Sequence, residues 1–280
     1  MPNSKRPAPA ATKTAAPDRR SKVQSAGMGM SILKALAGMG GAASLTALAA
    51  RVDENPSKVH RYLASLVEAD LVVQDISSSH YVLGPESLAI GLAAMRQSDP
   101  LTLAAAELVQ LGESRNLSCF VSVLGNCGPT IVRWSEPTQP VAVNVRIGSV
   151  MPVLWSATGR AFGAFSRSTA QLEALIAHEL EIATPRQRAL LADRRAADHL
   201  FEEIRARGCA PVSDLYLNGI SAVAAPVRNA DGAVPVVITA LGPSGAFDPS
   251  PGGEIAGAVR QAAAAVSKRL GHGGVVILPI

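Results

Sequence analysis

A helical repeat of apolar residues after position 55 is the clearest pattern in the chain. Val59, Leu63 and Leu66 lie on one face of a helix, because they are spaced by four and three residues. Asn55 and Pro56 stand directly before them. Asn is a favoured N-cap, and Pro fits the first helical position because its missing N–H needs no partner there. The pattern predicts a helix from this point to about residue 70.

A shorter apolar stripe precedes this helix, and two β-type runs follow it. Ser44 is a suitable N-cap for a helix that carries Leu45 and Leu48, and residues 52–55 turn the chain between the two helices. An earlier helix is expected over Ser31–Ala37, because glycines at positions 27 and 29 weaken any longer start. The runs LVVQ and HYVL, joined by the polar DISSS, predict a hairpin. Together these elements predict a winged helix-turn-helix over residues 23–84.

The rest of the chain predicts a linker and a second domain. Gly84 and Pro85 interrupt the pattern, and helical spacing then predicts a linker helix over residues 85–100 and another helix to about Arg115. The strand-like runs are CFVSVL, PTIVRWS, VAVNVRI, GCAPV, ISAVAAPVR and VPVVITALG. Helical blocks are expected at 169–180, at 186–206 and from Pro249 to Leu270. Separate blocks of strands and helices favour an α+β domain, here residues 101–272, followed by a short apolar tail at 273–280.

Charge is concentrated at the N-terminus. The chain has a net charge of +4, but residues 1–22 hold six basic residues against one acidic residue, which leaves −1 for the remainder. This tail is rich in Pro, Ala and Ser and cannot bury an apolar core, so we expect it to be disordered. It serves either as a solubilising leader or as a basic arm that contacts DNA phosphates.

Several protein classes are disfavoured. The tail lacks the apolar region of a secretion signal, and no stretch reaches the about 20 uncharged apolar residues of a membrane span. The three cysteines form no CxxC pair, which argues for a reducing compartment. The five histidines have no metal-ligand spacing, and GxSxG, HExxH, GxxxxGK[ST] and GxGxxG motifs are absent. We therefore expect a cytoplasmic protein with no metal, no cofactor and no catalytic residues.

The second helix of the predicted helix-turn-helix has a polar leading turn that fits the DNA major groove. That groove admits one helix, and the apolar face would hold the helix on its own domain. The candidate DNA-binding residues are Ser57, Lys58, His60 and Arg61, supported by Ser44, Asn55, Ser65 and His80. Residues 23–84 carry a net charge of −1. Lys58 and Arg61 therefore either contact DNA directly, act together with the basic tail, or lie on a helix face that only contacts water.

Both halves of the chain resemble one known family. The segments are VQS, SLTALAARV, PSKVHRYLASLVEADLV and YVLGPESLAIG in the first half, and VRIGSVMPVLWSATGRAFGAF and GISAVAAPVRNADGAVPVVITALGP in the second. Over about Val23–Leu270 the chain resembles IclR-type bacterial transcriptional regulators. The resemblance implies a winged helix-turn-helix joined by a helical linker to a GAF-like α+β domain that binds a small organic effector. It also implies a homodimer or tetramer on a near-palindromic double-stranded DNA operator.

The irregular stretch at 151–159 is the candidate effector site. A helix that begins near Ala157 presents free N–H groups and a positive dipole end, which suit a carboxylate. Met151, Trp155 and Phe162 either wall an apolar pocket or fill the core. The resemblance implies, by position, that the cleft is lined by Leu154, Ala157, Thr158, Gly159, Asp214, Ala222, Thr239 and Leu241.

Departures from the family pattern bear on both sites. Lys58 stands where the family commonly has Thr, and Ser221-Ala222 replaces a frequent Arg-Cys. Leu241 adds bulk where small hydroxyl residues are usual. Fewer polar anchors lead us to expect an aromatic or longer-chain acid rather than a two- or three-carbon acid.

Two other functions stay open on the sequence alone. One is an enzyme on a GAF-like domain with a vestigial DNA-binding module, which the missing acid–base pair disfavours. The other is an interaction protein whose helix-turn-helix no longer binds DNA, in keeping with the net charge of −1 over residues 23–84.

Overall fold

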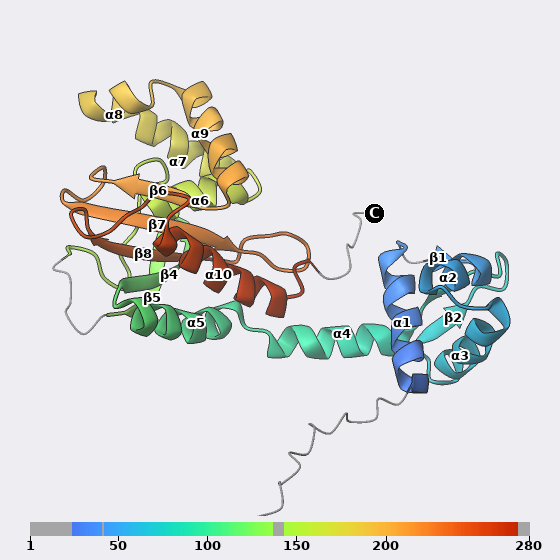
Figure 1. Ribbon diagram of the computed structural model, residues 1–280. Helices are drawn as coiled ribbons and strands as arrows, with labels where there is room; N and C mark the ends of the chain where they lie inside the picture. Colours follow the sequence, from blue (N-terminus) through green and yellow to red (C-terminus); the bar gives the residue numbers. More distant parts are fainter. Residues whose placement is uncertain (1–23, 41, 137–142, 274–280) are drawn as a thin grey trace, which may run out of the picture.

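The computed structural model describes residues 24–40, 42–136 and 143–273 and shows two lobes joined by a helix (Figure 1). The expected basic tail at 1–22 and all but the first residue of the segment 273–280 lie outside these ranges. The first lobe contains α1 (Gln24–Gly38), β1 (Ala42–Ala43), α2 (Leu45–Val52), α3 (Pro56–Glu68), β2 (Val72–Gln74) and β3 (Tyr81–Leu83). Its strands form an antiparallel sheet in the order β1-β3-β2. This arrangement confirms the winged helix-turn-helix.

The core of the first lobe is built from the predicted apolar faces. Val59 and Leu63 of α3 are fully buried, together with Leu48 of α2 and Ile32 of α1. α1 begins at Gln24 rather than at residue 31, so the predicted start is wrong. Gly27 and Gly29 lie in its first turns, where a side chain would meet no neighbouring atom within 4 Å. Each glycine lowers helix stability by about 1 kcal/mol relative to Ala, and the packing of α1 on α2 and α3 outweighs this cost.

The second lobe is a five-stranded antiparallel sheet between two layers of helices (Figure 1). The strand order is β5-β4-β8-β7-β6. The strands are β4 (Ser118–Gly125), β5 (Gly128–Ser135), β6 (Ala210–Ser213), β7 (Ile220–Val227) and β8 (Val236–Pro243). One face is covered by α5 (Pro100–Arg115) and α10 (Glu254–Arg269). The other is covered by α6 (Ala157–Phe165), with α7 (Ala170–Glu181) and α9 (Arg194–Arg207) packed in the same core. α8 (Pro185–Leu190) buries none of its residues. The expected α+β domain is confirmed.

Side chains alternate between the two faces of the sheet, and each face forms its own core with the helices that cover it. Ile238 and Ala240 of β8 pack against α5 and α10, whereas Val237 packs against the layer of α6, α7 and α9. Thr239 and Leu241 lie on the same side of the strand as Val237, because successive side chains point to opposite faces. This side carries the cavity described below.

Two predicted elements differ in the structure. The strand expected over 141–147 is absent from its described part, residues 143–147. The chain turns at Gly148, whose φ is +90°, and only the following residues run beside β5, where the Met151 N–H donates to the Pro129 carbonyl at 2.7 Å. The single helix expected over 186–206 is split into α8 and α9. The split has a local cause, because the Asp193 carboxylate caps α9 by accepting a hydrogen bond from the Ala196 N–H at 2.8 Å.

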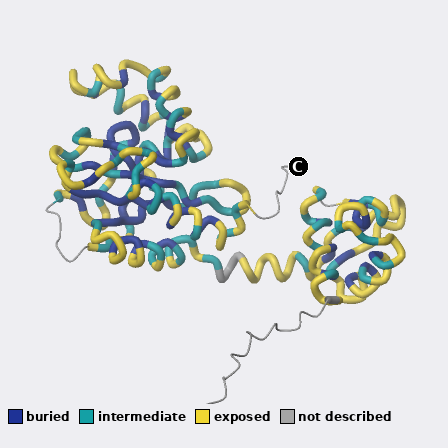
Figure 2. The backbone as a smooth tube through the Cα atoms, in the orientation of Figure 1, coloured by how far each residue is buried: buried dark blue, intermediate teal, exposed yellow. Residues whose placement is uncertain are grey.

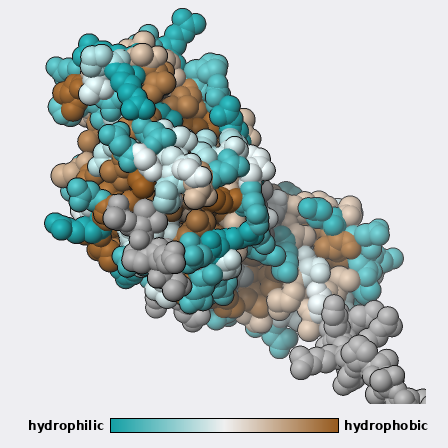
Figure 3. Space-filling model, turned by 60° about the vertical axis from the view of Figure 1, so that its left-hand side comes forward, coloured by the Kyte–Doolittle hydropathy of each residue, from teal (hydrophilic) through white to brown (hydrophobic). Residues whose placement is uncertain are grey.

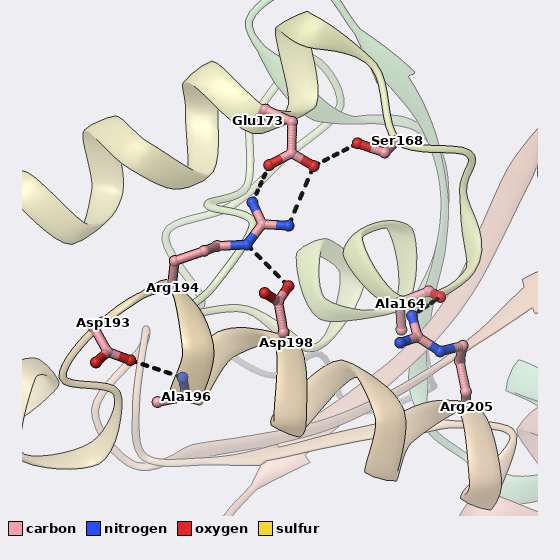
Figure 4. Close-up of polar contacts among 8 residues, drawn as sticks. All are labelled: Ala164, Ser168, Glu173, Asp193, Arg194, Ala196, Asp198 and Arg205. Carbon is pink, nitrogen blue, oxygen red and sulfur yellow. Dashed lines mark hydrogen bonds and ion pairs between the residues drawn. The ribbon is translucent and has the colours of Figure 1, made fainter.

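An ion pair links α9 to α7. Arg194 at the start of α9 binds Glu173 of α7, and its Nε donates to Asp198 one turn further on at 2.9 Å (Figure 4). Ser168 also donates to Glu173, and these contacts lower the pKa of the Glu173 carboxyl, chiefly through the Arg194 hydrogen bond. In the same layer, Arg205 donates to the carbonyl of Ala164 at the end of α6 at 2.9 Å (Figure 4). Arg194 is thus matched to carboxylates, and Arg205 to a helix C-terminus.

α4 (Pro85–Gln97) joins the two lobes in the region predicted as the linker. Figure 2 shows it as largely exposed, in contrast to the buried strands of the second lobe. α5, which follows it, contributes Ala104, Leu108 and Leu111 to the core of the second lobe and so belongs to that lobe. Within the described ranges, every helix is too short or too polar to cross a membrane.

Candidate functional site

The exposed face of α3 is the candidate DNA-binding surface. Ser57, His60, Arg61 and Ser65 are all exposed, as the helical pattern predicted. Asn55 caps the helix, because its side-chain oxygen accepts a hydrogen bond from the Ser57 N–H at 2.9 Å. The polar leading turn of α3 is therefore open to solvent and can approach a groove.

Besides Asn55, two further candidate DNA-binding residues already have partners within the domain. The Lys58 ammonium lies 2.6 Å from a carboxylate oxygen of Glu54, and the Lys58 side chain is only 40% exposed. The Ser44 hydroxyl caps α2 by accepting from the Ala47 N–H at 3.2 Å. Lys58 must therefore exchange or share its carboxylate partner to reach a phosphate, whereas Arg61 needs no such exchange.

The hairpin between β2 and β3 forms a compact turn. The Asp75 carboxylate accepts hydrogen bonds from the Ser77 N–H at 2.8 Å, the Ser77 hydroxyl at 2.7 Å and the Ser78 hydroxyl at 3.0 Å. These bonds, led by the Ser77 hydroxyl, lower the pKa of Asp75 to about 2. His80 is exposed nearby. Ile76 is 99% exposed at the tip, and sequence reasoning missed it although it is the one apolar residue in the DISSS run.

A small cavity lies between the sheet and the N-terminus of α6. Its volume is about 30 Å³, close to the space of one water molecule. The lining residues are Phe120, Met151, Ser156, Ala157, Thr158, Val212, Tyr216, Leu217, Ile220, Ala222, Thr239 and Leu241. Six of the candidate effector residues are among them, and the structure thus brings together positions from the 151–159 stretch, β7 and β8.

Backbone N–H groups and two hydroxyls form the polar part of this cavity. Thr158 and Thr239 share a buried hydrogen bond of 2.9 Å between their hydroxyl oxygens. Ser156 caps α6 by accepting from the Gly159 N–H at 2.9 Å and donates to the Pro152 carbonyl at 2.7 Å. The N–H groups of Ala157 and Thr158 then remain without an intrahelical partner at the cavity wall, as in any first helical turn. Such a turn attracts a carboxylate.

Phe120, which lines the cavity, stacks on Trp134, which is not a lining residue. The rings of Phe120 and Trp134 stack with centroids 5.4 Å apart and an interplanar angle of 4°. The indole Nε1 of Trp134 is buried and has no hydrogen-bond partner among the described residues. Sequence reasoning missed both residues, because periodicity places them on strands but does not show which strand face meets α6.

The other five candidate effector residues lie outside the cavity lining. Leu154, Trp155 and Phe162 pack in the core between the sheet and the layer of α7 and α9. Gly159 allows a close approach of backbones, because a Cβ there would stand 2.0 Å from the Pro152 carbonyl oxygen. Asp214 shapes a loop, with φ of 49° and a carboxylate oxygen that accepts from the Gly219 N–H at 2.7 Å.

The remaining reactive side chains have ordinary surroundings. Burial raises the pKa of the Cys119 thiol to about 12, in keeping with its prediction as a packed apolar residue. Cys127 is exposed, and His178 and His199 lie on the surface as predicted. The described ranges contain no group of three His, Cys, Asp or Glu side chains that is arranged to hold a metal ion.

Comparison with known families and proteins agrees with this geometry. The IclR helix-turn-helix domain matches residues 25–75, and the C-terminal domain of IclR bacterial transcriptional regulators matches residues 93–268. The chain is 30% identical to the glycerol operon regulatory protein of Streptomyces griseus, over 90% of this chain and 98% of that protein.

Solved structures show the same architecture. Pseudomonas aeruginosa HmgR is 40% identical with a TM-score of 0.77, covering 90% of this chain and all of that one. An IclR homologue from Microbacterium hydrocarbonoxydans, solved as a complex with 4-hydroxybenzoate, is 18% identical with a TM-score of 0.52, covering 88% and 98% of the two chains. The two matched domains and the relatives together show that the chain belongs to the IclR family of DNA-binding bacterial transcriptional regulators.

Proposed function

We propose that this regulator binds an aromatic carboxylic acid in the cavity at the start of α6 and thereby changes its affinity for its operator. The observation that supports this ligand class is the combination of the Phe120–Trp134 stack with the N–H groups of Ala157 and Thr158. The helix N-terminus suits the carboxylate, and the stacked rings suit an aromatic body. The relative solved with 4-hydroxybenzoate is consistent with this class.

The cavity must open to receive such a ligand. A volume of about 30 Å³ holds about one water molecule, far less than a benzoate ring needs. Tyr216 and Leu217, which close one side, belong to the loop between β6 and β7. An effector therefore binds a form in which this loop has moved, and a ligand that prefers one form shifts the equilibrium between the two.

Calorimetric titration of the full chain with 4-hydroxybenzoate and pyruvate tests the proposal. We expect saturable binding of the aromatic acid and at least tenfold weaker binding of pyruvate. Ala222→Leu adds three carbon atoms to the cavity wall and should abolish binding, whereas Ala177→Leu on the exposed side of α7 is the matched control. Binding of only two- or three-carbon acids, or unchanged binding in Ala222→Leu, would refute the assignment.

We propose in addition that two copies pair through α4. Leu88, Ile90 and Leu92 are 65%, 55% and 43% exposed on this 13-residue helix, and Leu88 and Leu92 lie one turn apart on the same face. A second copy is the partner that a near-palindromic operator requires. Light scattering on Leu88→Gln should show a lower mass than the parent at equal concentration. Ile182→Gln, at a 63% exposed site on the second lobe, should leave the mass unchanged. A parent that is monomeric at micromolar concentration would refute the pairing.

We also propose that the chain acts without catalysing a reaction, in the cytoplasm where bacterial DNA lies. The cavity lining includes no Asp, Glu, His, Lys or Cys side chain, so no strong acid–base pair faces a bound ligand. Recovery of unchanged 4-hydroxybenzoate after prolonged incubation with the protein is the expected result. Any product formed in proportion to protein concentration would favour the enzyme alternative.

A further inference from the structure

A second opening lies beside the effector cavity, on the outer side of β6. It is a groove of about 640 Å³ between α8, α9 and this strand. Its lining residues are Arg160, Arg186, Ala189, Leu190, Leu191, Leu200, Pro211, Val212, Ser213 and Leu215. β6 is the edge strand of the sheet, which keeps the groove open on one side. Val212 lines both the groove and the small cavity and so separates them.

The Arg160 guanidinium in this groove has no carboxylate partner. Its Nε donates to the Leu154 carbonyl at 2.7 Å, and no carboxylate of the described residues lies at ion-pair distance. It is the fourth residue of α6, near the positive end of that helix, which disfavours a cation. Burial lowers the pKa of Arg160 to about 10, so the group still carries its charge at neutral pH. A mostly buried cation in such a place is costly unless an anion accompanies it.

A second guanidinium and an apolar wall complete the groove. Arg186 of α8 is exposed, and it donates only to the backbone carbonyl of Asp214, at 3.0 Å. Leu190 of the same helix is 58% exposed, and Leu191, Leu200 and Leu215 lie along the groove. Figure 3 shows apolar side chains interleaved with hydrophilic ones at the top of the molecule, at the level of α7–α9 in Figure 1.

The contrast with Arg194 in the same helical layer is informative. Arg194 lies between the carboxylates of Glu173 and Asp198, so its charge is matched within the protein (Figure 4). Among the described residues, Arg160 and Arg186 donate hydrogen bonds only to backbone carbonyls, and both line the groove. Their charge is therefore available to a ligand, and the ligand's apolar part can cover leucines that water now contacts.

We propose that this groove is a second ligand site that binds an amphipathic carboxylate. The carboxylate lies between Arg160 and Arg186, and an aliphatic body extends along Leu190, Leu191 and Leu200. Two guanidiniums present paired N–H donors to a carboxylate, and covering the leucine side chains removes apolar surface from water. The site is independent of the effector cavity, because the strand that carries Val212 stands between them.

Titration of the full chain with octanoate, 1-octanol and acetate tests the site. We expect octanoate to bind with one site per chain, and both the neutral alcohol and the short acid to bind at least tenfold more weakly. Arg186→Gln should weaken octanoate binding about tenfold, because a charge-assisted pair is lost. Arg195→Gln on the exposed side of α9 is the matched control and should have no effect. Arg186 is used rather than Arg160 because substitution of an exposed side chain leaves the fold intact.

Leu190→Ser tests the apolar wall in the same way, with Ile182→Ser as its control at a similarly exposed site outside the groove. Ala222→Leu, which fills the small cavity, should leave octanoate binding unchanged. The proposal is overturned if Ala222→Leu abolishes octanoate binding, if 1-octanol binds as tightly as octanoate, or if Arg186→Gln has no effect. These outcomes are separate from those for aromatic acids, so the two sites stand or fall independently.

Discussion

Replacing Arg61 with Ala is the most direct test of the DNA-binding surface. The Arg61 side chain is exposed on α3 and forms no ion pair with the described residues, so its removal leaves no carboxylate unmatched. An exposed substitution of this kind changes the free energy of unfolding by no more than about 0.5 kcal/mol. Any large change in operator affinity then reports on the protein–DNA contact itself.

The expected loss depends on what Arg61 contacts. A bidentate contact to a base edge contributes about 1–3 kcal/mol of discrimination, which corresponds to a roughly 5- to 150-fold loss of affinity for the native operator. A contact to phosphate instead lowers affinity for all sequences and reduces the slope of log affinity against log salt by about 0.9. Comparison of the native operator with an unrelated duplex at several salt concentrations separates the two.

Lys58 provides an internal comparison. Its ammonium lies 2.6 Å from Glu54, so a DNA contact must compete with this ion pair. Lys58→Ala should therefore cost less affinity than Arg61→Ala, and Glu54→Gln should tighten binding to unrelated duplex DNA by releasing the ammonium. Fluorescence anisotropy on the native upstream DNA and on an unrelated duplex measures all three. Unchanged affinity and salt slope in Arg61→Ala, together with a large loss in Lys58→Ala, would show that Lys58 makes the contact assigned here to Arg61.

Three further changes have definite expected outcomes. Gly159→Ala places a Cβ 2.0 Å from the Pro152 carbonyl oxygen, so we expect the free energy of unfolding to fall by about 1–3 kcal/mol or more. An unchanged Tm in thermal unfolding would contradict this close approach of the two backbones. Iodoacetamide at pH 8 should label Cys127 in the folded protein. Cys119 is buried and has a pKa of about 12, so it should react only after unfolding. Equal labelling rates for the two thiols in the folded protein would refute the burial of Cys119. Deletion of residues 1–22 should flatten the salt dependence of DNA binding if the tail contacts phosphates, and an unaltered slope would leave it a solubilising leader.

Local signals made the first lobe predictable. The spacing of Val59, Leu63 and Leu66 and the Asn-Pro start of α3 specify both the helix and the face that it buries, and the structure agrees. The start of α1 was not predictable in this way. Helix propensity penalises Gly27 and Gly29, but packing of the helix on its neighbours decides the outcome, and packing is not visible in a single segment.

In the second lobe, the alternation of apolar and polar residues is not enough to predict which segments form strands or which residues line the cavity. VAVNVRI has the composition of a strand, yet its described part runs irregularly before the turn at Gly148. The 151–159 stretch was recognised as special, but Leu154 and Trp155 proved to be core residues, and Phe120, which stacks on Trp134, proved to line the cavity. Which residues share a cavity depends on strand order and on the face that each strand presents, and both are set by contacts between distant segments.

The strand β4 connects the effector cavity to the helix that leads to the DNA-binding lobe. Phe120 lines the cavity, while its neighbours Cys119 and Val121 point to the opposite face and pack with Leu108 of α5. α5 follows the linker helix α4 after two residues. A ligand that displaces Phe120 should therefore shift α5, because a close-packed interior transmits displacement. Hydrogen exchange at the amides of α5 should change when 4-hydroxybenzoate binds. A change confined to α6 and the loop between β6 and β7 would mean that coupling to DNA runs by another route.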